Sequence, residues 1–313
     1  MDSKLHLVLG GSGAIGRGVI KELQKRGLQV KAVERSKEVD GIETVKADLL
    51  DMTQAKKAIR GADFVYLCVG LSYQSKYWQE NWPRLMRNVI QACSESKSKL
   101  IFFDNWYMYG PPLPVPIVEN SPQNTQTKKG LARKETADLL LEAHRAGSVK
   151  ALIGRSADFY GPMAINSGLY SNILKRMLEG KNPQWIGNPK TQHTYAYTDD
   201  NSRALIELAL DERCYGEVWH LPVEKPTTTY SMLDLFNAEL GKTYKLSVMP
   251  KPMLKILSIF IKGLKELDEM SYQFESDFVM SDKKFRSHFP QFKTTPYNIG
   301  VKEMVDSFRT INK

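Results

Sequence analysis

Three glycines near the N-terminus have the spacing of a phosphate-binding loop. They follow an apolar run at residues 5–9 and precede a segment of helical periodicity at residues 15–26. In such a loop the first glycine permits a tight turn, the second lets a pyrophosphate approach backbone N–H groups, and the third lets the helix pack closely on a strand. The helix N-terminus adds positive potential for the phosphates. The sequence therefore predicts that a dinucleotide binds at Gly10, Gly13, Ala14, Ile15 and Gly16.

An acidic and a basic residue stand side by side after the next predicted strand, residues 28–33. Glu34 could bind both ribose hydroxyls of NAD and repel the additional phosphate of NADP, whereas Arg35 could hold that phosphate. The sequence thus predicts NAD or NADP as the cofactor and does not separate the two.

Strand-like and helix-like segments alternate along the first eighty residues. The predicted strands at 28–33 and 64–69 enclose a short strand at 45–47 and a helix at 52–59. The run 64–69 is apolar throughout, as strands of parallel sheets are when both faces are buried. This alternation predicts an α/β fold with a Rossmann-type, doubly wound parallel sheet. Amphipathic helical patterns in residues 226–313 add a smaller, mostly helical C-terminal substrate lobe.

The composition is that of a folded globular protein and excludes several classes of function. With 42% hydrophobic and 25% charged residues, the chain can bury a core. The net charge of +9 comes from lysines and arginines interleaved with acids, so we expect no nucleic-acid partner. The apolar stretch at residues 253–264 is too short to span a bilayer and carries two lysines, so we expect a core or interface helix and no membrane partner.

The three cysteines, Cys68, Cys93 and Cys214, have neither metal-ligand nor disulfide spacing. We therefore expect no metal site and a reducing compartment. The N-terminal residues do not resemble a leader sequence, and the expected location is cytoplasmic.

Seven further segments carry motifs of a known superfamily. They are Ala47–Leu49, Gly61–Val65, Val69–Gly70, Asn81–Val89, Tyr109–Gly110, Arg155–Pro162 and Tyr195–Asp200. From residue 3 to about 225 the chain resembles the extended and atypical short-chain dehydrogenase/reductase superfamily, in particular its NAD-dependent epimerase/dehydratase group. The resemblance implies that Asp48 and Leu49 lie beside the adenine and that Val69 and Gly70 pass the cofactor.

The resemblance also implies how the chain is divided. An NAD(P)-binding Rossmann domain is expected over residues 1–162, and the segment 194–225 would return to its core. The substrate lobe would be assembled from residues 163–193 and 226–313. Relatives often dimerise through two long helices beside the fourth and fifth strands, so the resemblance allows a homodimer.

The catalytic pair of the superfamily, Tyr-x-x-x-Lys, is absent, because none of the fourteen tyrosines is followed by lysine four residues later. In the family the tyrosine is the general acid/base, while the lysine lowers its pKa and holds the nicotinamide ribose. Counting from Tyr109 puts the tyrosine position at Gly130 and the lysine position at Lys134, which is then the expected catalytic and ribose-binding residue. A shift of one residue gives Lys129 and Arg133 instead.

The loop after the fifth predicted strand offers substitutes for the missing phenol. Asn105 falls at the family's Ser/Thr position and can donate a hydrogen bond to a carbonyl, and Tyr107 supplies a hydroxyl. Asp104 is an alternative carboxylate base. Lys129 and Arg133 could favour a phenolate or bind an anionic substrate.

Four other residues are candidates for substrate contact. Trp106 would be a pocket wall beside Tyr107, and Asp158 and Tyr160 would lie in a substrate loop after a core strand. His193 stands where relatives often place an arginine that holds a sugar-nucleotide diphosphate, which argues against a nucleotide-sugar substrate.

Three functional hypotheses follow from the sequence, and one of them, a nucleic-acid-binding or membrane-associated protein, is suggested only by the net charge of +9. The other two rest on the residues named above. The first is an NAD(P)-dependent oxidoreductase or epimerase/dehydratase-like enzyme that acts on a small carbonyl or alcohol substrate with a non-standard catalytic centre. The second, favoured by the missing tyrosine, is a non-catalytic NAD(P)-binding redox sensor or scaffold.

Overall fold

The computed structural model describes residues 4–260 and 262–311. They form two compact units, each assembled from separate stretches of the chain. The first unit comprises residues 4–108, 128–156 and 201–221, and the second comprises 109–127, 157–200, 222–260 and 262–311.

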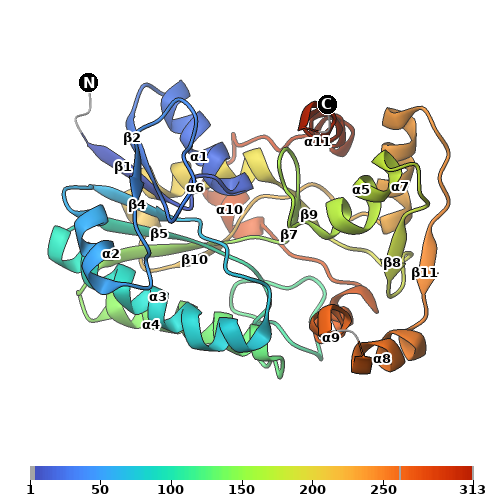
Figure 1. Ribbon diagram of the computed structural model, residues 1–313. Helices are drawn as coiled ribbons and strands as arrows, with labels where there is room; N and C mark the ends of the chain where they lie inside the picture. Colours follow the sequence, from blue (N-terminus) through green and yellow to red (C-terminus); the bar gives the residue numbers. More distant parts are fainter. Residues whose placement is uncertain (1–3, 261, 312–313) are drawn as a thin grey trace. The chain divides into compact units, whose positions relative to one another are not determined.

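The first unit is built on a parallel sheet of seven strands (Figure 1). The strand order is β10-β6-β5-β4-β1-β2-β3. From β1 the chain adds strands first on one side and then, from β4 on, on the other side, as in a doubly wound fold. The strands are β1 (Leu5–Leu9), β2 (Gln29–Glu34), β3 (Thr44–Lys46), β4 (Phe64–Leu67), β5 (Lys99–Asp104), β6 (Lys150–Arg155) and β10 (Val218–His220). Every residue of β4 is buried, which confirms the fold class predicted from its unbroken apolar run.

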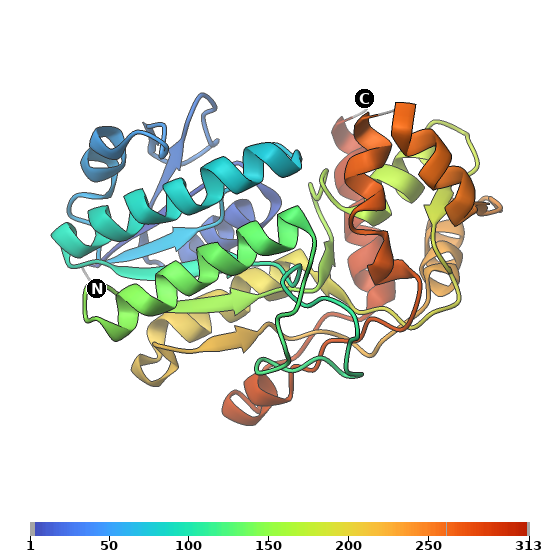
Figure 2. The same cartoon turned by 90° about the horizontal axis from the view of Figure 1, so that it is seen from below.

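Helices cover both faces of this sheet. Figure 2 shows α3 and α4 side by side on one face, with α1 and α6 behind the sheet. The helices are α1 (Ala14–Lys25), α2 (Met52–Ile59), α3 (Ser75–Ser96), α4 (Lys128–Arg145) and α6 (Thr198–Leu210). Asp51 caps α2 by accepting a hydrogen bond from the Gln54 amide, and Gly27, with φ +69°, follows the end of α1.

The second unit is mostly helical, as expected, and also holds two short parallel strand pairs. Strand β7 (Asp158–Tyr160) pairs with β9 (Tyr195–Tyr197), and β8 (Gln184–Ile186) pairs with β11 (Ser247–Met249). Its helices are α5 (Lys175–Leu178), α7 (Thr229–Leu240), α8 (Lys251–Phe260), α9 (Lys262–Asp268), α10 (Lys283–His288) and α11 (Tyr297–Ile311). Short π and 3-10 turns lie at Leu169–Leu174, Glu212–Cys214 and Ser271–Phe274, the second of them in the first unit. Among the described helices, none has the length and apolar character needed to cross a membrane.

The observed units differ from the expected division in the segment 109–127. We expected it within the Rossmann domain, but it belongs to the second unit, where Ile117 forms a parallel bridge with Met280. Residues 157–162 and 194–200 also group with the second unit, because β7 and β9 pair with each other. The segment 109–127 forms no helix, so it offered no periodicity from which its partner could be read.

A buried hydrogen bond on α3 gives a test of the packing in the first unit. The Asn88 side-chain amide donates to the Leu49 carbonyl at 2.9 Å, and both residues are buried. Because Asn88→Ala leaves that carbonyl buried without this donor, we expect the free energy of unfolding to fall by about 1–3 kcal/mol in urea titration. The control Gln91→Ala removes an exposed amide from the same helix and should change stability by less than about 0.5 kcal/mol. Equal losses in the two variants would contradict this assignment.

Candidate functional site

The glycine loop between β1 and α1 leaves no room for side chains at two positions. A Cβ on Gly10, which has φ +85°, would lie 2.9 Å from backbone atoms of Val69, and one on Gly16 would lie 2.2 Å from the Gly10 carbonyl oxygen. Gly13, the N-cap of α1, has no side-chain cap, and the first turn of α1 has no acidic residue. A helix N-terminus of this kind can accept a phosphate.

Residues around the loop fit the predicted dinucleotide. Ala14 begins α1, while Ile15 is buried and its carbonyl accepts a hydrogen bond from the Ser202 hydroxyl. The Glu34 carboxylate at the end of β2 accepts a hydrogen bond from the Ser12 amide at 2.5 Å, so it faces the phosphate loop. Arg35 is exposed to solvent. An acid held beside the loop is the arrangement that suits the ribose hydroxyls of NAD.

The other expected cofactor residues lie in the first unit near the ends of its strands. Asp48 accepts a hydrogen bond from the Leu50 amide and so orders the turn after β3, and Leu49 is buried. Val69 and Gly70 follow β4 directly, at the carboxyl edge where open parallel sheets bind ligands. Burial raises the pKa of the neighbouring Cys68 thiol to about 12, so this thiol stays protonated near neutral pH and is a poor nucleophile.

The rotation of α4 decides which of its cations face the sheet. Lys129 and Arg133 lie on the buried face of the helix, and their side chains are almost completely inaccessible to solvent. Lys134 lies instead on the outer face, where its side chain is 38% exposed and its amine pairs with Asp138 at 2.6 Å. The expected register with Lys134 on the sheet side is therefore wrong, since one residue rotates a helix by about 100°. The alternative register with Lys129 and Arg133 is the one that faces inward.

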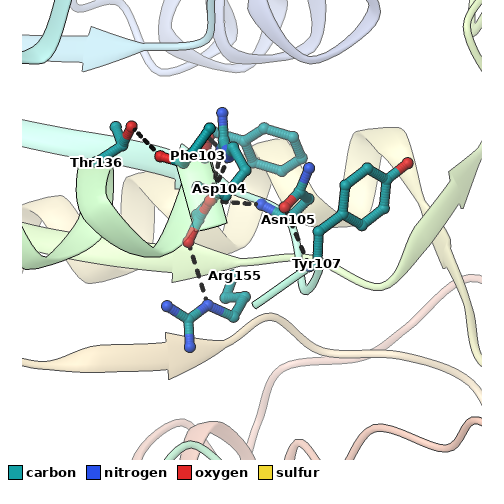
Figure 3. A network of polar contacts seen from close by, with 8 residues as sticks. Phe103, Asp104, Asn105, Tyr107, Thr136 and Arg155 are labelled. Carbon is teal, nitrogen blue, oxygen red and sulfur yellow. Dashed lines mark hydrogen bonds and ion pairs between the residues drawn. The ribbon is translucent and has the colours of Figure 1, made fainter. Parts of the chain in front are cut away.

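Asp104, at the end of β5, is held between two arginines in the interior of the first unit (Figure 3). Its Oδ1 accepts a hydrogen bond from Arg133 Nε at 2.8 Å, and its Oδ2 accepts one from Arg155 Nε at 3.2 Å. The Arg133 guanidinium also lies over the rings of Trp82 and Phe102, at 4.2 and 4.8 Å. Burial lowers the pKa of Arg133, and the Asp104 charge opposes this shift. With a cation on each oxygen, Asp104 is poorly suited to act as a base.

The ion cluster of Asp104, Arg133 and Arg155 also orders the loop after β5. Asp104 Oδ1 accepts a hydrogen bond from the Asn105 amide at 2.9 Å, and Asn105 Oδ1 accepts one from the Tyr107 amide at 3.2 Å. Figure 3 shows the Tyr107 ring extending away from Asp104.

A second set of polar side chains, which we call the tyrosine–lysine cluster, consists of Tyr73, Ser75, Tyr107 and Lys129. The Lys129 amine donates to the Ser75 hydroxyl at 3.1 Å and lies 4.5 Å from the centroid of the Tyr73 ring. The Tyr73 hydroxyl donates to the Tyr107 hydroxyl at 3.4 Å. Trp78 stacks on Tyr107 with ring centroids 6.0 Å apart. Two phenols and a buried cation are thus brought together from the segments after β4 and β5 and from α4.

Sequence reasoning found two members of this cluster and missed the other two. Tyr107 and Lys129 were candidates, although Lys129 was expected to contact substrate. Tyr73 and Ser75 belong to no motif. They could have been found by taking every polar side chain shortly after a buried strand, because such positions meet at the carboxyl edge of the sheet.

Two of the remaining substrate candidates, Trp106 and Tyr160, are fully buried. Trp106 has no exposed surface. Tyr160 is also fully buried and packs against Tyr197 and Tyr297, and burial raises its pKa. Tyr160 thus lies in the core of the second unit, and its contact with substrate stays a prediction.

Asp158, the first residue of β7, and His193, two residues before β9, form an ion pair in the second unit if the imidazole is protonated, and otherwise a hydrogen bond. His193 Nε2 lies 2.8 Å from Asp158 Oδ2, and the imidazole is 2% exposed. The rings of Phe274 and Phe278 stack against it. Of the two residues, Asp158 keeps the more accessible side chain, at 26%.

The ion cluster predicts a large difference in stability between breaking a buried and breaking an exposed ion pair of α4. Asp104→Asn removes the charge that two buried arginines share, so we expect a loss of about 3–5 kcal/mol in the free energy of unfolding. Lys134→Ala breaks only the exposed pair with Asp138 and should cost less than about 1 kcal/mol. Chemical denaturation of both variants measures the difference. A larger loss of stability for Lys134→Ala than for Asp104→Asn would contradict the assignment of Arg133 to the buried face of α4 and of Lys134 to its outer face.

Known proteins share both the sequence pattern and the fold. The chain is 25% identical over 245 residues to a UDP-N-acetyl-alpha-D-glucosaminuronate decarboxylase of Bacillus cytotoxicus, which covers 71% of this chain and 75% of the relative. The fold of the present chain is similar to that of the UDP-glucuronic acid 4-epimerase of Bacillus cereus in complex with NAD, with a TM-score of 0.81 and 16% identity. The match covers 99% of this chain and 100% of the epimerase. A UDP-glucose 4-epimerase of Thermotoga maritima gives TM-score 0.81 at 19% identity, with the same coverage.

The family assignment rests on a match along most of the first unit. The model of the NAD dependent epimerase/dehydratase family matches residues 6–218. This match confirms the predicted resemblance and the predicted class of cofactor, a nicotinamide dinucleotide. The phosphate loop, the acid at the end of β2 and the seven-stranded sheet are what that cofactor requires. The chain therefore belongs to the NAD-dependent epimerase/dehydratase family.

Proposed function

We propose that the protein is an NAD-dependent enzyme that interconverts an alcohol and a carbonyl, with the tyrosine–lysine cluster in place of the usual Tyr-x-x-x-Lys pair. The observation that carries this proposal is the contact between the Tyr73 and Tyr107 hydroxyls, 3.4 Å apart, with the Lys129 amine over the Tyr73 ring. These groups follow β4 and β5 at the carboxyl edge of the sheet, where ligands of this fold class bind.

The two tyrosines have different roles in this proposal. Tyr107 presents its hydroxyl proton to the substrate, and the Tyr73 hydroxyl hydrogen-bonds to the Tyr107 oxygen. In carbonyl reduction Tyr107 gives this proton to the substrate oxygen and becomes a phenolate, which the Tyr73 hydrogen bond stabilises. In alcohol oxidation the phenolate takes the proton back. Bound NAD supplies the chemistry of accepting or giving the hydride.

Lys129 supports this exchange electrostatically. Its ammonium group lies over the face of the Tyr73 ring, where it withdraws electron density and makes the Tyr73 hydroxyl a stronger donor. Ser75 holds the amine in place. Asn105 completes the set, since its Oδ1 is used by the Tyr107 amide and its side-chain NH₂ is the group suited to a carbonyl oxygen.

The substrate proposed is a small alcohol or carbonyl compound. The relatives named above are enzymes of UDP-sugars. At the position where such enzymes often hold the diphosphate with an arginine, this chain has His193, which is buried and paired with Asp158. A neutral or singly charged substrate suits that difference better than a nucleoside diphosphate.

A non-catalytic redox sensor is the second candidate, and one observation favours it. Lys134, the residue expected at the family's lysine position, pairs with Asp138, and Arg133, the alternative one residue earlier, is bound to Asp104. Neither side chain is left without a carboxylate partner in the structure. A protein of this kind would bind NAD and NADH with different affinities and would turn over no substrate.

The catalytic proposal predicts a specific loss in two variants. In a screen of aldehydes, ketones, alcohols and UDP-sugars followed by nicotinamide absorbance, Tyr107→Phe should lower kcat by about 10²-fold or more, because the proton donor is gone. Lys129→Met should lower kcat to a smaller extent and shift its pH profile. The control Tyr230→Phe, at an exposed tyrosine of α7, should leave kcat unchanged. Binding of NADH without turnover of any compound would favour the sensor instead.

The position of Glu34 predicts a preference for NAD over NADP. Its carboxylate would repel a 2′-phosphate, so wild-type protein should bind NADH more tightly than NADPH by about tenfold or more in fluorescence titration. Glu34→Gln should reduce this ratio. Glu43→Gln, which changes a surface carboxylate paired with Lys31, should not. Tighter binding of NADPH than of NADH by the wild-type protein would contradict this prediction and would indicate that Arg35, by binding the 2′-phosphate, determines the cofactor preference.

A further inference from the structure

The pair of Asp158 and His193 belongs to a larger group of polar side chains within the second unit. His193 Nε2 lies 2.8 Å from Asp158 Oδ2. The imidazole is held in this position, since its ring stacks on Phe278 and its backbone exchanges two hydrogen bonds with Thr227. The ring of Tyr272 contacts the same phenylalanine at a centroid distance of 6.2 Å. One oxygen of the carboxylate is therefore fixed by the interior of the unit, and Tyr272 lies on the other side of the same aromatic ring.

Tyr272 lies close enough to Asp158 to respond to its charge. Burial raises the pKa of Tyr272, and the negative charge of Asp158 raises it further. The Tyr272 hydroxyl donates to the Tyr109 carbonyl at 2.8 Å, which fixes the direction of the phenol. The phenol and the carboxylate are thus neighbours in one polar group.

Gln273 and Thr125 are almost completely buried beside Tyr272. Their exposed fractions are 1% and 3%, and both side chains offset part of the effect that burial has on the pKa of Tyr272. Among the residues that the structure describes, none accepts a well-formed hydrogen bond from the buried Nε2 of Gln273. Such orphaned donors are rare in folded proteins, because each leaves a desolvated polar group without compensation. We call this group the Asp158 site; its members are Asp158, His193, Tyr272, Gln273 and Thr125.

The Asp158 site combines an open acceptor with an unmet donor. Asp158 Oδ2 is used by His193, whereas no described residue donates to Oδ1, and the side chain is 26% exposed. The unmet donor is Gln273 Nε2. Hydroxyl groups both donate and accept, so neighbouring hydroxyls of one molecule can satisfy the carboxylate and the amide together.

Two other kinds of ligand fit the Asp158 site less well. An ionised phosphate or carboxylate only accepts hydrogen bonds, and the charge of Asp158 would repel it. An ammonium group would pair with Asp158, but it only donates and would leave the Gln273 amide unsatisfied. The donor and acceptor set therefore favours a neutral ligand with several hydroxyls.

We propose that the Asp158 site binds a polyhydroxylated group, as in a sugar or a polyol that carries no phosphate. Resting on the proposed function, this assigns the substrate to polyhydroxy alcohols and carbonyl compounds. Asp158 is the residue that contacts the ligand and determines specificity. His193 is a positioning residue, because it is 2% exposed and acts through Asp158.

Binding of sugars with and without phosphate tests this inference in the absence of turnover. The probes are D-glucose, D-glucose 6-phosphate and 1-butanol, each added to the full-length chain with NADH present and followed by saturation-transfer NMR. We expect saturation transfer to D-glucose and none to the other two, because the first alone has several hydroxyls and no charge.

Asp158→Asn should change the specificity of the site and not only its affinity. Binding of D-glucose should weaken by about tenfold, since a charged acceptor becomes a neutral one. D-glucose 6-phosphate should now bind, because the repulsion is removed. The control Asp234→Asn changes an exposed carboxylate of α7 in the same unit and should alter neither result.

Gln273→Met separates a role in binding from a role in the fold. Because the buried Nε2 has no well-formed bond within the described residues, the thermal midpoint should stay unchanged or rise, while D-glucose binding weakens by about fivefold. A drop in the thermal midpoint would contradict the place of Gln273 in the site.

Two results would overturn the inference as a whole. One is the absence of saturation transfer to D-glucose, and the other is equal binding of D-glucose and D-glucose 6-phosphate by the wild-type protein. These results are distinct from a failure of the proposed enzyme. Binding of D-glucose without turnover of any compound would support the Asp158 site and contradict the proposed activity. Turnover of a simple aldehyde without binding of D-glucose would do the reverse.

Discussion

The carboxylate of Asp104 is buried in the first unit, and the structure around it depends on keeping two arginines in contact with that charge. Arg133 comes from α4 and Arg155 from β6, while Asp104 ends β5. Because an unpaired buried charge costs several kcal/mol, the three elements cannot rotate or slide independently. The stacking of Arg133 on Trp82 and Phe102 extends the same constraint to α3 and to the middle of β5. The carboxyl edge of the sheet is thereby fixed.

The same constraint sets which side chains of α4 lie near the catalytic centre that we propose. With Arg133 directed at Asp104, the residue one turn earlier on α4, Lys129, also faces inward, and its amine reaches Ser75 and the Tyr73 ring. Asp104 and Asn105 then order the backbone that presents Tyr107. Arg133 is held by Asp104, and the positive charge near the phenols comes from Lys129. In the proposed centre, Tyr107 from the loop after β5 takes the place of a tyrosine from α4.

The parts of the molecule that local backbone geometry dictates could be predicted from the sequence. Gly10 and Gly16 have no space for a Cβ, so the glycines alone were enough to predict the phosphate loop. The apolar run of β4 likewise predicted a buried parallel strand. The register of α4 could not be counted from a motif, since a shift of one residue separates the buried Arg133 from the exposed Lys134 and tertiary burial decides between them. Tyr73 belongs to no pattern at all. The complete burial of Tyr160 and Trp106 could not be read from their residue types either, because these types suit a pocket wall and a core equally well.

A crystal structure with NADH and a bound carbonyl inhibitor would test the central claim most directly. The account predicts the Tyr107 hydroxyl within hydrogen-bonding distance of the inhibitor oxygen, Lys129 still over the Tyr73 ring, and Lys134 still paired with Asp138 on the outer face of α4. A complex in which Tyr107 points away from the nicotinamide, while Lys134 or Arg133 contacts its ribose, would contradict the account.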